Sequence, residues 1–313
     1  MVNKKIAFSI ALGCTFGMTT LSHAEILVIL PETGPMASAS ESIKQGFIQA
    51  NKQSSDKYKI KFVDVNDQPL DHILKKHITK TTELVVGPLE KSSVEQILSI
   101  KPKVKTLALN QVGRHVQGIY QFALSKEEDA LALTKQMQKD GIERIFALRE
   151  TDTANQTQSF YDAMQELWGD KLEVKDSIPL FLRDNQAILL LGSNNWLVKQ
   201  KLPKKRIYTL PFAIAENIKL PQGLVYCDTP ALYTGQWQDV IAAYRLNPVS
   251  LPFQRLIAFG GDAWQIADQI KQQKNQQPIE FLGRTGKVRI VGGLIERQPQ
   301  CFKSEASGQQ SAL

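Results

Sequence analysis

Cysteine and histidine are scarce in this chain of 313 residues, which contains three of the former and four of the latter. Three cysteines are too few for a disulfide-framework protein, and no cysteine or histidine cluster has the spacing of a zinc site. The HExxH, GxSxG and phosphate-loop motifs are missing, as is the G-x-G-x-x-G dinucleotide fingerprint. The sequence therefore predicts no catalytic residue, no metal and no cofactor, and the protein is not expected to be an enzyme.

Neither positive nor negative charge is in large excess. The chain has 38 Lys and Arg against 31 Asp and Glu, a formal net charge of +7. No basic stripe with interleaved aromatic residues is present, so no nucleic-acid partner is expected. A modest positive charge is typical of a soluble surface, with attraction to anionic polymers or lipid head groups as the alternative. Hydrophobic residues make up 42%, which is enough for a full core and excludes a disordered chain.

Only the first segment of the chain has a long apolar run. Two lysines precede the run at residues 6–18, and small residues stand at Ser22 and Ala24. This pattern is typical of a cleavable export signal, and the run is too short to span a bilayer. We expect a leader at residues 1–24 and a mature protein in the periplasm.

The same segment offers a second cleavage point. Ala11-Leu-Gly-Cys14 loosely resembles a bacterial lipobox, although Ala11 stands where a large aliphatic residue is usual. Cleavage there leaves a lipidated Cys14 and a protein anchored to the outer membrane, facing the periplasm. No later apolar run approaches the ~18 residues of a membrane helix. A membrane contact is therefore expected only through such an anchor, and the two cleavage points remain alternatives.

Strand and helix patterns alternate after the leader. The short apolar run at 25–30 is typical of a parallel strand covered on both faces. The S-x-x-E sequences that begin at Ser38, Ser92 and Ser125 predict helix N-caps. A second, similar unit begins at Ser125, and residues 178–187 leave no room for a full crossover helix. We predict an α/β fold of two lobes, each a mostly parallel sheet flanked by helices.

The expected lobes divide the chain unevenly. We assign residues 25–124 and 229–285 to lobe 1, and residues 125–228 and 286–303 to lobe 2. Residues 304–313 are small and polar, which predicts a flexible tail.

A two-lobed fold of this kind has a cleft at the carboxyl ends of its strands, where helix N-termini can receive an anionic ligand. Ser92 and Ser93 are explained either as helix caps or as hydroxyl and amide donors to such a ligand. The residues expected to reach the cleft are Glu32, Thr33, Ser38, Ser92, Ser93, Asn110, Gln111, Thr151 and Gln156.

Two cysteines lie outside the leader, Cys227 and Cys301. Both fall in lobe 2 under the expected division. In an oxidising periplasm they form either a disulfide or two buried thiols, and the sequence leaves both open.

Several stretches line up, in order, with one family. They are Val85–Leu89 (VVGPL), Lys91–Ile97, Leu107–Gln111 (LALNQ), Tyr120–Ser125 (YQFALS), the acidic residues 127–129, Ala258–Ala267 (AFGGDAWQIA), the turn at 283–286 and Ile295–Arg297. Together they resemble the C-terminal domain of LpoA-type penicillin-binding protein activators. The resemblance implies a type I periplasmic-binding-protein fold in an outer-membrane lipoprotein. It also implies a class A penicillin-binding protein as partner, whose peptidoglycan synthesis is stimulated without catalysis by the activator.

The chain departs from that family pattern in three places. No helical repeat domain is expected between the leader and the first strand. The lipobox is imperfect, and lobe 2 is shortened around Arg183–Gln186.

Two functions follow from these observations. The first is a non-enzymatic regulator of cell-wall synthesis, with Trp168, Trp196 and Trp237 as exposed anchors of a docking surface or as ordinary packing residues. The alternative is a periplasmic solute-binding protein that takes a small polar ligand, an amino acid or a wall fragment, in its cleft.

Overall fold

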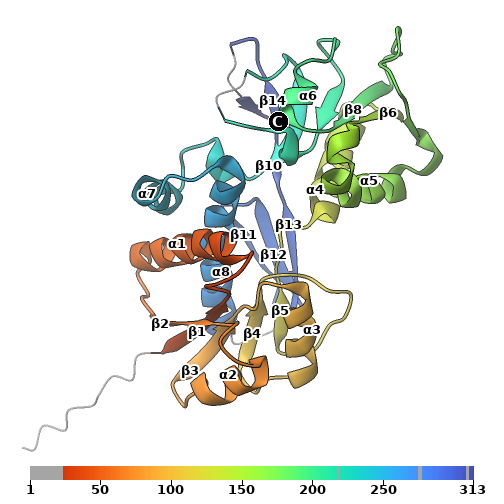
Figure 1. Cartoon of the computed structure of the whole chain (residues 1–313). Helices are drawn as coiled ribbons and strands as arrows, with labels where there is room; N and C mark the ends of the chain where they lie inside the picture. Colours follow the sequence, from red (N-terminus) through yellow and green to blue (C-terminus); the bar gives the residue numbers. More distant parts are fainter. Residues whose placement is uncertain (1–23, 217–218, 274–276, 308–309) are drawn as a thin grey trace, which may run out of the picture.

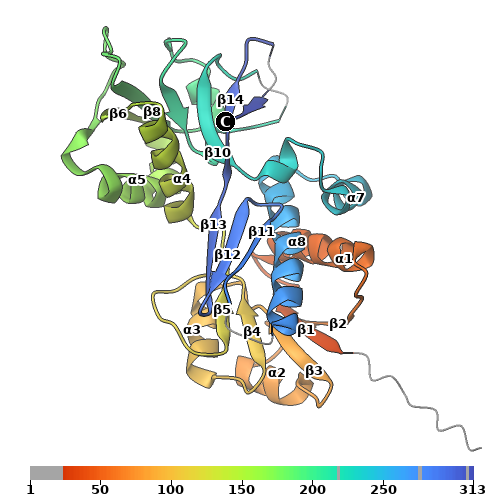
Figure 2. The same cartoon turned by 180° about the vertical axis from the view of Figure 1, so that it is seen from behind.

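The protein consists of two α/β lobes, one above the other in Figures 1 and 2. This computed structural model describes residues 24–216, 219–273, 277–307 and 310–313. The predicted leader, including Cys14, lies outside the described residues except for Ala24. Among the described residues, none of the helices has the length and apolar character needed to cross a membrane. The two-lobed α/β prediction is confirmed.

The first lobe is built on an eight-stranded sheet with the order β11-β12-β13-β5-β4-β3-β1-β2. Its strands are β1 (Glu25–Leu30), β2 (Lys59–Asp64), β3 (Thr82–Val86), β4 (Lys105–Ala108), β5 (Ile119–Gln121), β11 (Ile279–Leu282), β12 (Lys287–Val291) and β13 (Leu294–Gln298). Its helices are α1 (Ala37–Gln53), α2 (Leu70–His77), α3 (Lys91–Ile100), α7 (Gln238–Leu246) and α8 (Leu251–Gln272). Strands β1 to β5 are parallel to their neighbours, whereas β11, β12 and β13 pair antiparallel with one another.

Strand β1 shows why its apolar run is continuous. Ile26, Val28 and Leu30 face the core that α1 and α8 cover, and Leu27 and Ile29 face the core under α2 and α3. Successive side chains of a strand point to opposite faces, so burial on both faces requires an unbroken apolar run.

Helices α1 and α8 cross closely because glycines stand at the crossing. A Cβ atom on Gly46 would lie 1.9 Å from the carbonyl oxygen of Ile257, and one on Gly260 would lie 2.0 Å from that of Ile43. No side chain fits at these distances, so the crossing requires glycine at both positions.

The second lobe is built on a seven-stranded sheet with the order β15-β14-β10-β9-β8-β6-β7. Its strands are β6 (Arg144–Arg149), β7 (Leu172–Val174), β8 (Gln186–Leu191), β9 (Ile207–Thr209), β10 (Leu224–Asp228), β14 (Gln300–Ser304) and β15 (Gln310–Ala312). Its helices are α4 (Lys126–Lys139), α5 (Ala154–Trp168) and α6 (Asn194–Leu197). The connection from β7 to β8, residues 175–185, contains no helix.

The structure corrects the expected division at the C-terminal end. Residues 286–298 were assigned to lobe 2, but β12 and β13 belong to the sheet of lobe 1, where β13 pairs with β5. Of the segment 286–303 expected in lobe 2, only β14 lies in the second sheet. The tail prediction is also wrong for residues 310–312, because β15 pairs antiparallel with β14. An antiparallel hairpin can extend either sheet, so its sequence identifies the strands but not the sheet that they join.

Of the three serines expected to cap helices, only Ser125 does so. The Ser125 hydroxyl accepts a hydrogen bond from the backbone N–H of Glu128 at 3.2 Å and begins α4. Helix α1 already begins at Ala37 and α3 at Lys91, so Ser38 and Ser92 lie inside their first turns. The S-x-x-E pattern lies in the first turn of these helices but misplaces each N-cap by two residues.

The chain passes between the lobes three times, at residues 122–125, at residues 229–237 and at Pro299. Buried ionic contacts hold the second of these passages. Arg255, at the start of α8, donates two hydrogen bonds to Asp228 at the end of β10, at 2.8 and 2.6 Å. The Asp228 side chain is 2% exposed and also accepts a bond from the Tyr233 hydroxyl at 2.6 Å.

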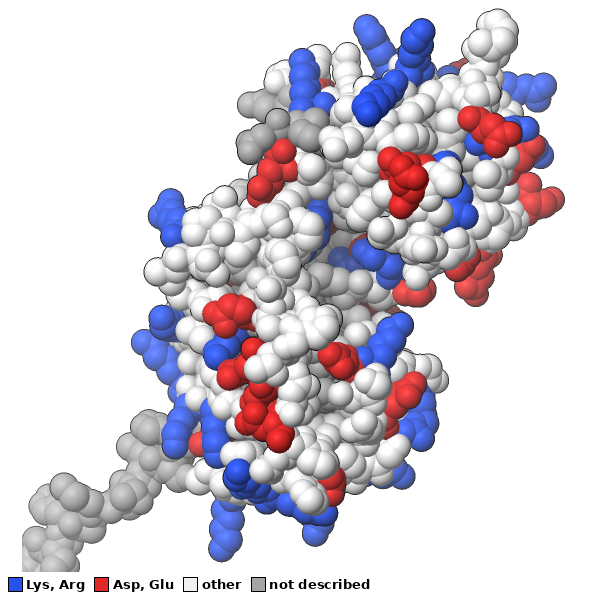
Figure 3. Space-filling view, viewed as in Figure 1, with Lys and Arg blue, Asp and Glu red and all other residues white. Residues whose placement is uncertain are grey.

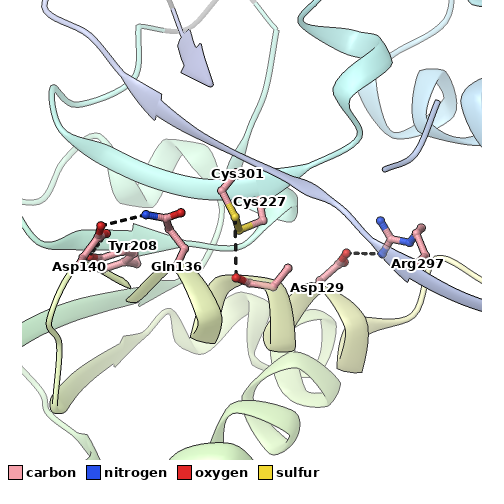
Figure 4. The surroundings of a disulfide bond; sticks show 8 residues. Asp129, Gln136, Asp140, Tyr208, Cys227, Arg297 and Cys301 are labelled. Atoms are coloured by element: carbon pink, nitrogen blue, oxygen red, sulfur yellow. Dashed lines mark hydrogen bonds and ion pairs between the residues drawn. A yellow bond between two sulfur atoms is a disulfide. The ribbon is translucent and has the colours of Figure 1, made fainter. Parts of the chain in front are cut away.

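A disulfide between Cys227 and Cys301 joins β10 to β14, next to two of the passages (Figure 4). The two cysteines are directly paired in the antiparallel ladder. The sulfur of Cys301 lies 3.8 Å from the carbonyl oxygen of Ala132, so the bond also packs on α4. Of the two alternatives left open by the sequence, the structure contains the disulfide.

Replacing both bridging cysteines, as in the Cys227→Ala, Cys301→Ala variant, is expected to lower the free energy of unfolding by about 2–4 kcal/mol, because the bridge closes a long loop in the unfolded chain. Urea unfolding followed by circular dichroism measures this loss. A reducing agent should destabilise the wild-type protein by a similar amount and leave the double variant unchanged. Equal sensitivity of both proteins to the reducing agent would contradict the prediction.

Candidate functional site

A cavity of about 880 Å³ lies between the two lobes, visible as the hollow in the middle of Figure 3. Lobe 1 contributes the loops after β3 and β4, the first turns of α3, and the β12–β13 turn. Lobe 2 contributes the start of α4 and Ser159 from α5. Its polar lining residues are Lys91, Glu95, Asn110, Gln111, His115, Gln121, Ser125, Lys126, Glu127, Glu128, Ser159 and Glu296.

Asn110 and Gln111 are the two predicted cleft residues that line this cavity. The Asn110 amide donates to the carbonyl of Leu89 at 2.9 Å, and its oxygen accepts the N–H of Gln111 at 2.9 Å. The Gln111 amide donates to the carbonyl of Ile295 at 3.3 Å. Both side chains therefore hold the loops of the cleft wall together.

Glu32 and Ser38 line a separate hollow of about 700 Å³, which corrects their expected place in the cleft. Phe253 of α8 lines this hollow, whereas Leu256 and Phe259 of the same helix line the interlobe cavity, so α8 separates the two.

The loop after β1 is held by its own polar contacts. Glu32 forms an ion pair with Lys44 at 2.9 Å. The Asp64 carboxylate accepts the backbone N–H of Glu32 at 3.0 Å and the hydroxyl of Thr33 at 3.3 Å. These contacts hold Thr33 against the end of β2, and Thr33 does not line the interlobe cavity.

The remaining predicted residues line neither of these two hollows. Ser92 is exposed and Ser93 half-buried in the first turn of α3, and Thr151 and Gln156 are exposed around the start of α5. The interpretation of Ser92 and Ser93 as N-caps is wrong, because Glu90 occupies the N-cap position. The second interpretation, as donors to an anionic ligand, stays a prediction without a cavity beside it.

Sequence reasoning missed the acidic wall of the cavity. Glu127 and Glu128 belong to the acidic run at residues 127–129, and Glu296 lies in the motif Ile295-Glu-Arg297. The Ser125 hydroxyl donates to Glu127 at 2.7 Å, so this carboxylate belongs to the cap of α4. Nothing in the sequence pairs Arg297 of the second motif with this run, because Arg297 and Asp129 lie 168 residues apart.

Arg297 of β13 pairs with this acidic run and joins the first sheet to the second lobe. Its side chain is 2% exposed. Its backbone N–H donates to Glu128 at 2.7 Å, its Nε donates to the same carboxylate at 3.3 Å, and its Nη2 donates to Asp129. The remaining guanidinium nitrogen donates to the carbonyl of Thr285 at 3.2 Å. Figure 4 shows Arg297 and Asp129 facing each other across the boundary between the lobes.

Burial governs the protonation of this cluster. Burial raises the pKa of the Glu128 carboxyl to about 7, although the neighbouring Arg297 lowers it. For Arg297 burial acts in the lowering direction, but the attraction of Asp129 and Glu128 is stronger and its pKa is raised. The guanidinium is therefore charged at every physiological pH, and Glu128 titrates near neutrality.

None of the three predicted tryptophan anchors is an exposed side chain. Trp168 is 7% exposed in the core of lobe 2, and its indole N–H donates to Thr134 at 2.9 Å. Trp196 and Trp237 are half-buried against the apolar clusters beneath them. The alternative explanation, ordinary packing, is the correct one.

No group of three or more His, Cys, Asp or Glu side chains in the described part of the chain is arranged to hold a metal ion. The polar groups of the cavity whose contacts are described above hold the loops of its wall, the start of α4 and the boundary between the lobes. The bonds from Arg297 to residues 128–129 therefore join the two lobes beside the cavity.

Comparison with known proteins identifies the family. The model of a family described as "LppC putative lipoprotein" matches residues 7–176, which is more than half of the chain. The chain belongs to the LppC family. A protein of Haemophilus ducreyi named penicillin-binding protein activator LpoA is 24% identical over 87% of the chain and 51% of its own length. The chain thus spans about half the length of the curated relatives it matches.

Solved structures carry the same fold. The C-domain of LpoA from Haemophilus influenzae, described as a regulator of PBP1A, matches with a TM-score of 0.74 at 19% identity, over 92% of this chain and 99% of that domain. A protein of Chromobacterium violaceum, described as a putative branched-chain amino acid ABC transporter, gives 0.72 at 20% identity, over 90% and 99%. The LppC-family chain therefore has the type I periplasmic-binding-protein fold, as the resemblance implied.

Replacing Arg297 by methionine is expected to lower the free energy of unfolding by about 3–5 kcal/mol, because Asp129 and Glu128 stay buried without their cation. Arg289 on the adjacent strand is the matched control, since its pairs with Glu280 and Glu296 are exposed and its loss should cost less than about 1 kcal/mol. Urea unfolding of Arg297→Met and Arg289→Met measures both. Equal losses would contradict the assignment.

The pKa of Glu128 predicts a pH dependence of stability. The carboxyl titrates near 4.5 when unfolded and near 7 when folded, so between these values the folded state holds more protons. Stability should therefore fall as pH rises through this window, by up to about 3 kcal/mol. Unfolding of wild-type protein and Glu128→Gln across pH 4 to 8 measures the difference, since the glutamine does not titrate. Parallel pH profiles would refute the assigned pKa.

Proposed function

We propose that this protein is a non-enzymatic envelope protein that binds and activates a class A penicillin-binding protein and so regulates peptidoglycan synthesis. The observation that carries the proposal is the length of the match: relatives named penicillin-binding protein activators align with 84–94% of the chain in the longest matches. The part of these relatives that the chain covers corresponds to the C-domain of the Haemophilus influenzae protein.

The polar groups of the interlobe cavity support a regulatory role over chemistry. Asn110 and Gln111 bond to backbone groups of the cavity wall, and Glu128 bonds to Arg297. Side chains that already hold protein groups are not free to activate a nucleophile or polarise a substrate. A protein of this kind acts through its surface.

The compartment is part of the proposal. The disulfide between Cys227 and Cys301 is typical of proteins that fold in an oxidising compartment. Together with the leader pattern it supports export to the periplasm, either free after cleavage at Ala24 or anchored to the outer membrane through Cys14.

Reconstitution tests the activator function. The exported form is added to a class A penicillin-binding protein of the same cell, and glycan polymerisation from lipid II is followed with time. We expect a saturable increase in rate, together with a complex of the two proteins in a pull-down. A two-lobed solute-binding protein of the same fold serves as the matched control and should leave the rate unchanged.

The same material separates the proposal from solute capture. A small ligand that binds the folded protein raises its melting temperature in a saturable way. Stabilisation by an amino acid or a wall fragment, with no change in glycan polymerisation, would overturn the activator function in favour of the solute-binding alternative.

A further inference from the structure

The connection between β7 and β8 carries two large apolar side chains into solvent. Leu180 is 94% exposed and Phe181 is 90% exposed. Ile178 and Leu182, on either side of them, are partly buried against the core of lobe 2. The core contacts therefore fix both ends of the segment while its tip points outward, as a projection at the free end of the second lobe (Figure 1).

A strongly basic segment lies in the same lobe. Residues 199–206, KQKLPKKR, contain five cationic residues and no acidic one. The side chains of Lys199, Lys201, Lys204 and Lys205 are all exposed. Such a cluster creates a local positive field that acts within about a Debye length of the surface.

Hydrogen bonds place the two features side by side. The guanidinium of Arg206, at the end of the basic segment, donates to the backbone carbonyl of Arg183 and to the carboxylate of Asp184, the latter at 3.0 Å. Strands β8 and β9, which follow the apolar tip and the basic segment respectively, are neighbours in the sheet. Figure 3 shows Lys and Arg side chains gathered at this end of the lobe.

The acidic groups nearby do not cancel this charge. Asp184 is paired with Arg206, whereas Glu143 accepts a hydrogen bond from the neutral amide of Asn185 at 2.7 Å and keeps its charge. Lys175 is paired with Glu173, which also faces Arg144. Residues 175–186 hold two charges of each sign, and Glu143 offsets only one of the five cations in residues 199–206, so a positive excess remains.

We infer that the free end of lobe 2 docks on an anionic phospholipid surface, with Leu180 and Phe181 entering the boundary between head groups and acyl chains. Exposed lysines above an apolar tip are the combination that interfacial membrane binding uses, because the apolar area and the attraction to anionic lipid add. Lysine is depleted at protein interfaces, which favours lipid over a protein partner. An anionic polymer in water would use the lysines but not the apolar pair.

The proposed contact is independent of the N-terminal anchor. Strand β1, where the described fold begins, lies in the other lobe, at the opposite end of the molecule in both views (Figures 1 and 2). The inference therefore does not rest on the lipidation of Cys14, and it goes beyond the proposed activator function.

Flotation with lipid vesicles tests the inference. The exported form that begins at Glu25, which contains every described helix and strand, is mixed with vesicles of phosphatidylethanolamine and phosphatidylglycerol or of phosphatidylcholine alone. We expect binding to the anionic vesicles only, weakening as salt rises from about 0.1 to about 0.5 M. The Leu180→Ser, Phe181→Ser variant should bind about tenfold less tightly or worse, and so should Lys204→Glu, Lys205→Glu.

Matched controls separate the two features from general hydrophobicity and charge. Leu246→Ser removes an exposed leucine of α7 in lobe 1, and Lys76→Glu, Lys80→Glu reverses two exposed lysines of that lobe. Both variants should bind like the wild-type protein. An equal loss in the controls, or equal binding to neutral and anionic vesicles, would overturn the inference, as would the absence of binding.

A probe at the tip reports insertion directly. Cys227 and Cys301 are joined in the disulfide, so a cysteine introduced as Phe181→Cys can be labelled alone with an environment-sensitive fluorophore. The emission should shift to the blue on anionic vesicles, and the same label on Leu246→Cys should not respond. An unshifted spectrum at the tip on bound protein would place the contact elsewhere and refute the inference.

Discussion

The arrangement of the two lobes depends on one buried cation. Arg297 leaves the first sheet immediately before the third passage of the chain, and its partners Glu128 and Asp129 stand immediately after the first passage. Arg255 and Asp228 hold the second passage in the same way. A buried charge that loses its partners is costly, so any rotation of the lobes that breaks these pairs is opposed. The disulfide adds a covalent tie on the lobe 2 side of the boundary.

The buried pairs affect function because they restrict the motion of one lobe relative to the other. A solute-binding protein closes its lobes around a ligand, and the hinge must turn freely enough to permit it. Replacement of a buried pair by apolar residues is often neutral for stability, so we attribute to these pairs a role in specifying one arrangement of the lobes. Arg297 also ties Thr285 and the 283–286 turn to the hinge, which extends the specified region into the C-terminal hairpin. A fixed arrangement suits a protein that presents one surface to a partner, whereas a capture protein needs two arrangements of similar free energy.

Local patterns predicted the parts of the fold that depend on neighbours in sequence. The continuous apolar run of β1, the Ser125 cap and the missing crossover helix after β7 were all readable from the chain. Long-range pairings were not. The hairpin of β12 and β13 alternates buried and exposed residues as a strand of either sheet would, and only its pairing with β5 decides the lobe.

The prediction of the cleft residues was wrong for the same reason. Cleft residues were expected at loops after strands, yet α8 returns from the far end of the sequence and separates Glu32 and Ser38 from the cavity. Likewise Trp168 lies at the C-terminal end of its helix, and the core that covers it comes from α4 and from strands distant in sequence. The local sequence does not say where a later segment of the chain will pack. In a fold whose chain passes between the lobes three times, such segments form most of the boundary.

The absence of a crossover helix between β7 and β8 determines part of the surface of lobe 2. In a doubly wound sheet a crossover helix covers the sheet with its own apolar face. Here residues 175–185 replace it, and only Ile178 and Leu182 reach the core. The apolar residues between them then have no layer to join, so Leu180 and Phe181 stand in solvent and contribute none of the stabilisation that burial would bring. The segment that replaces the crossover helix therefore leaves this apolar pair available for the lipid contact inferred above.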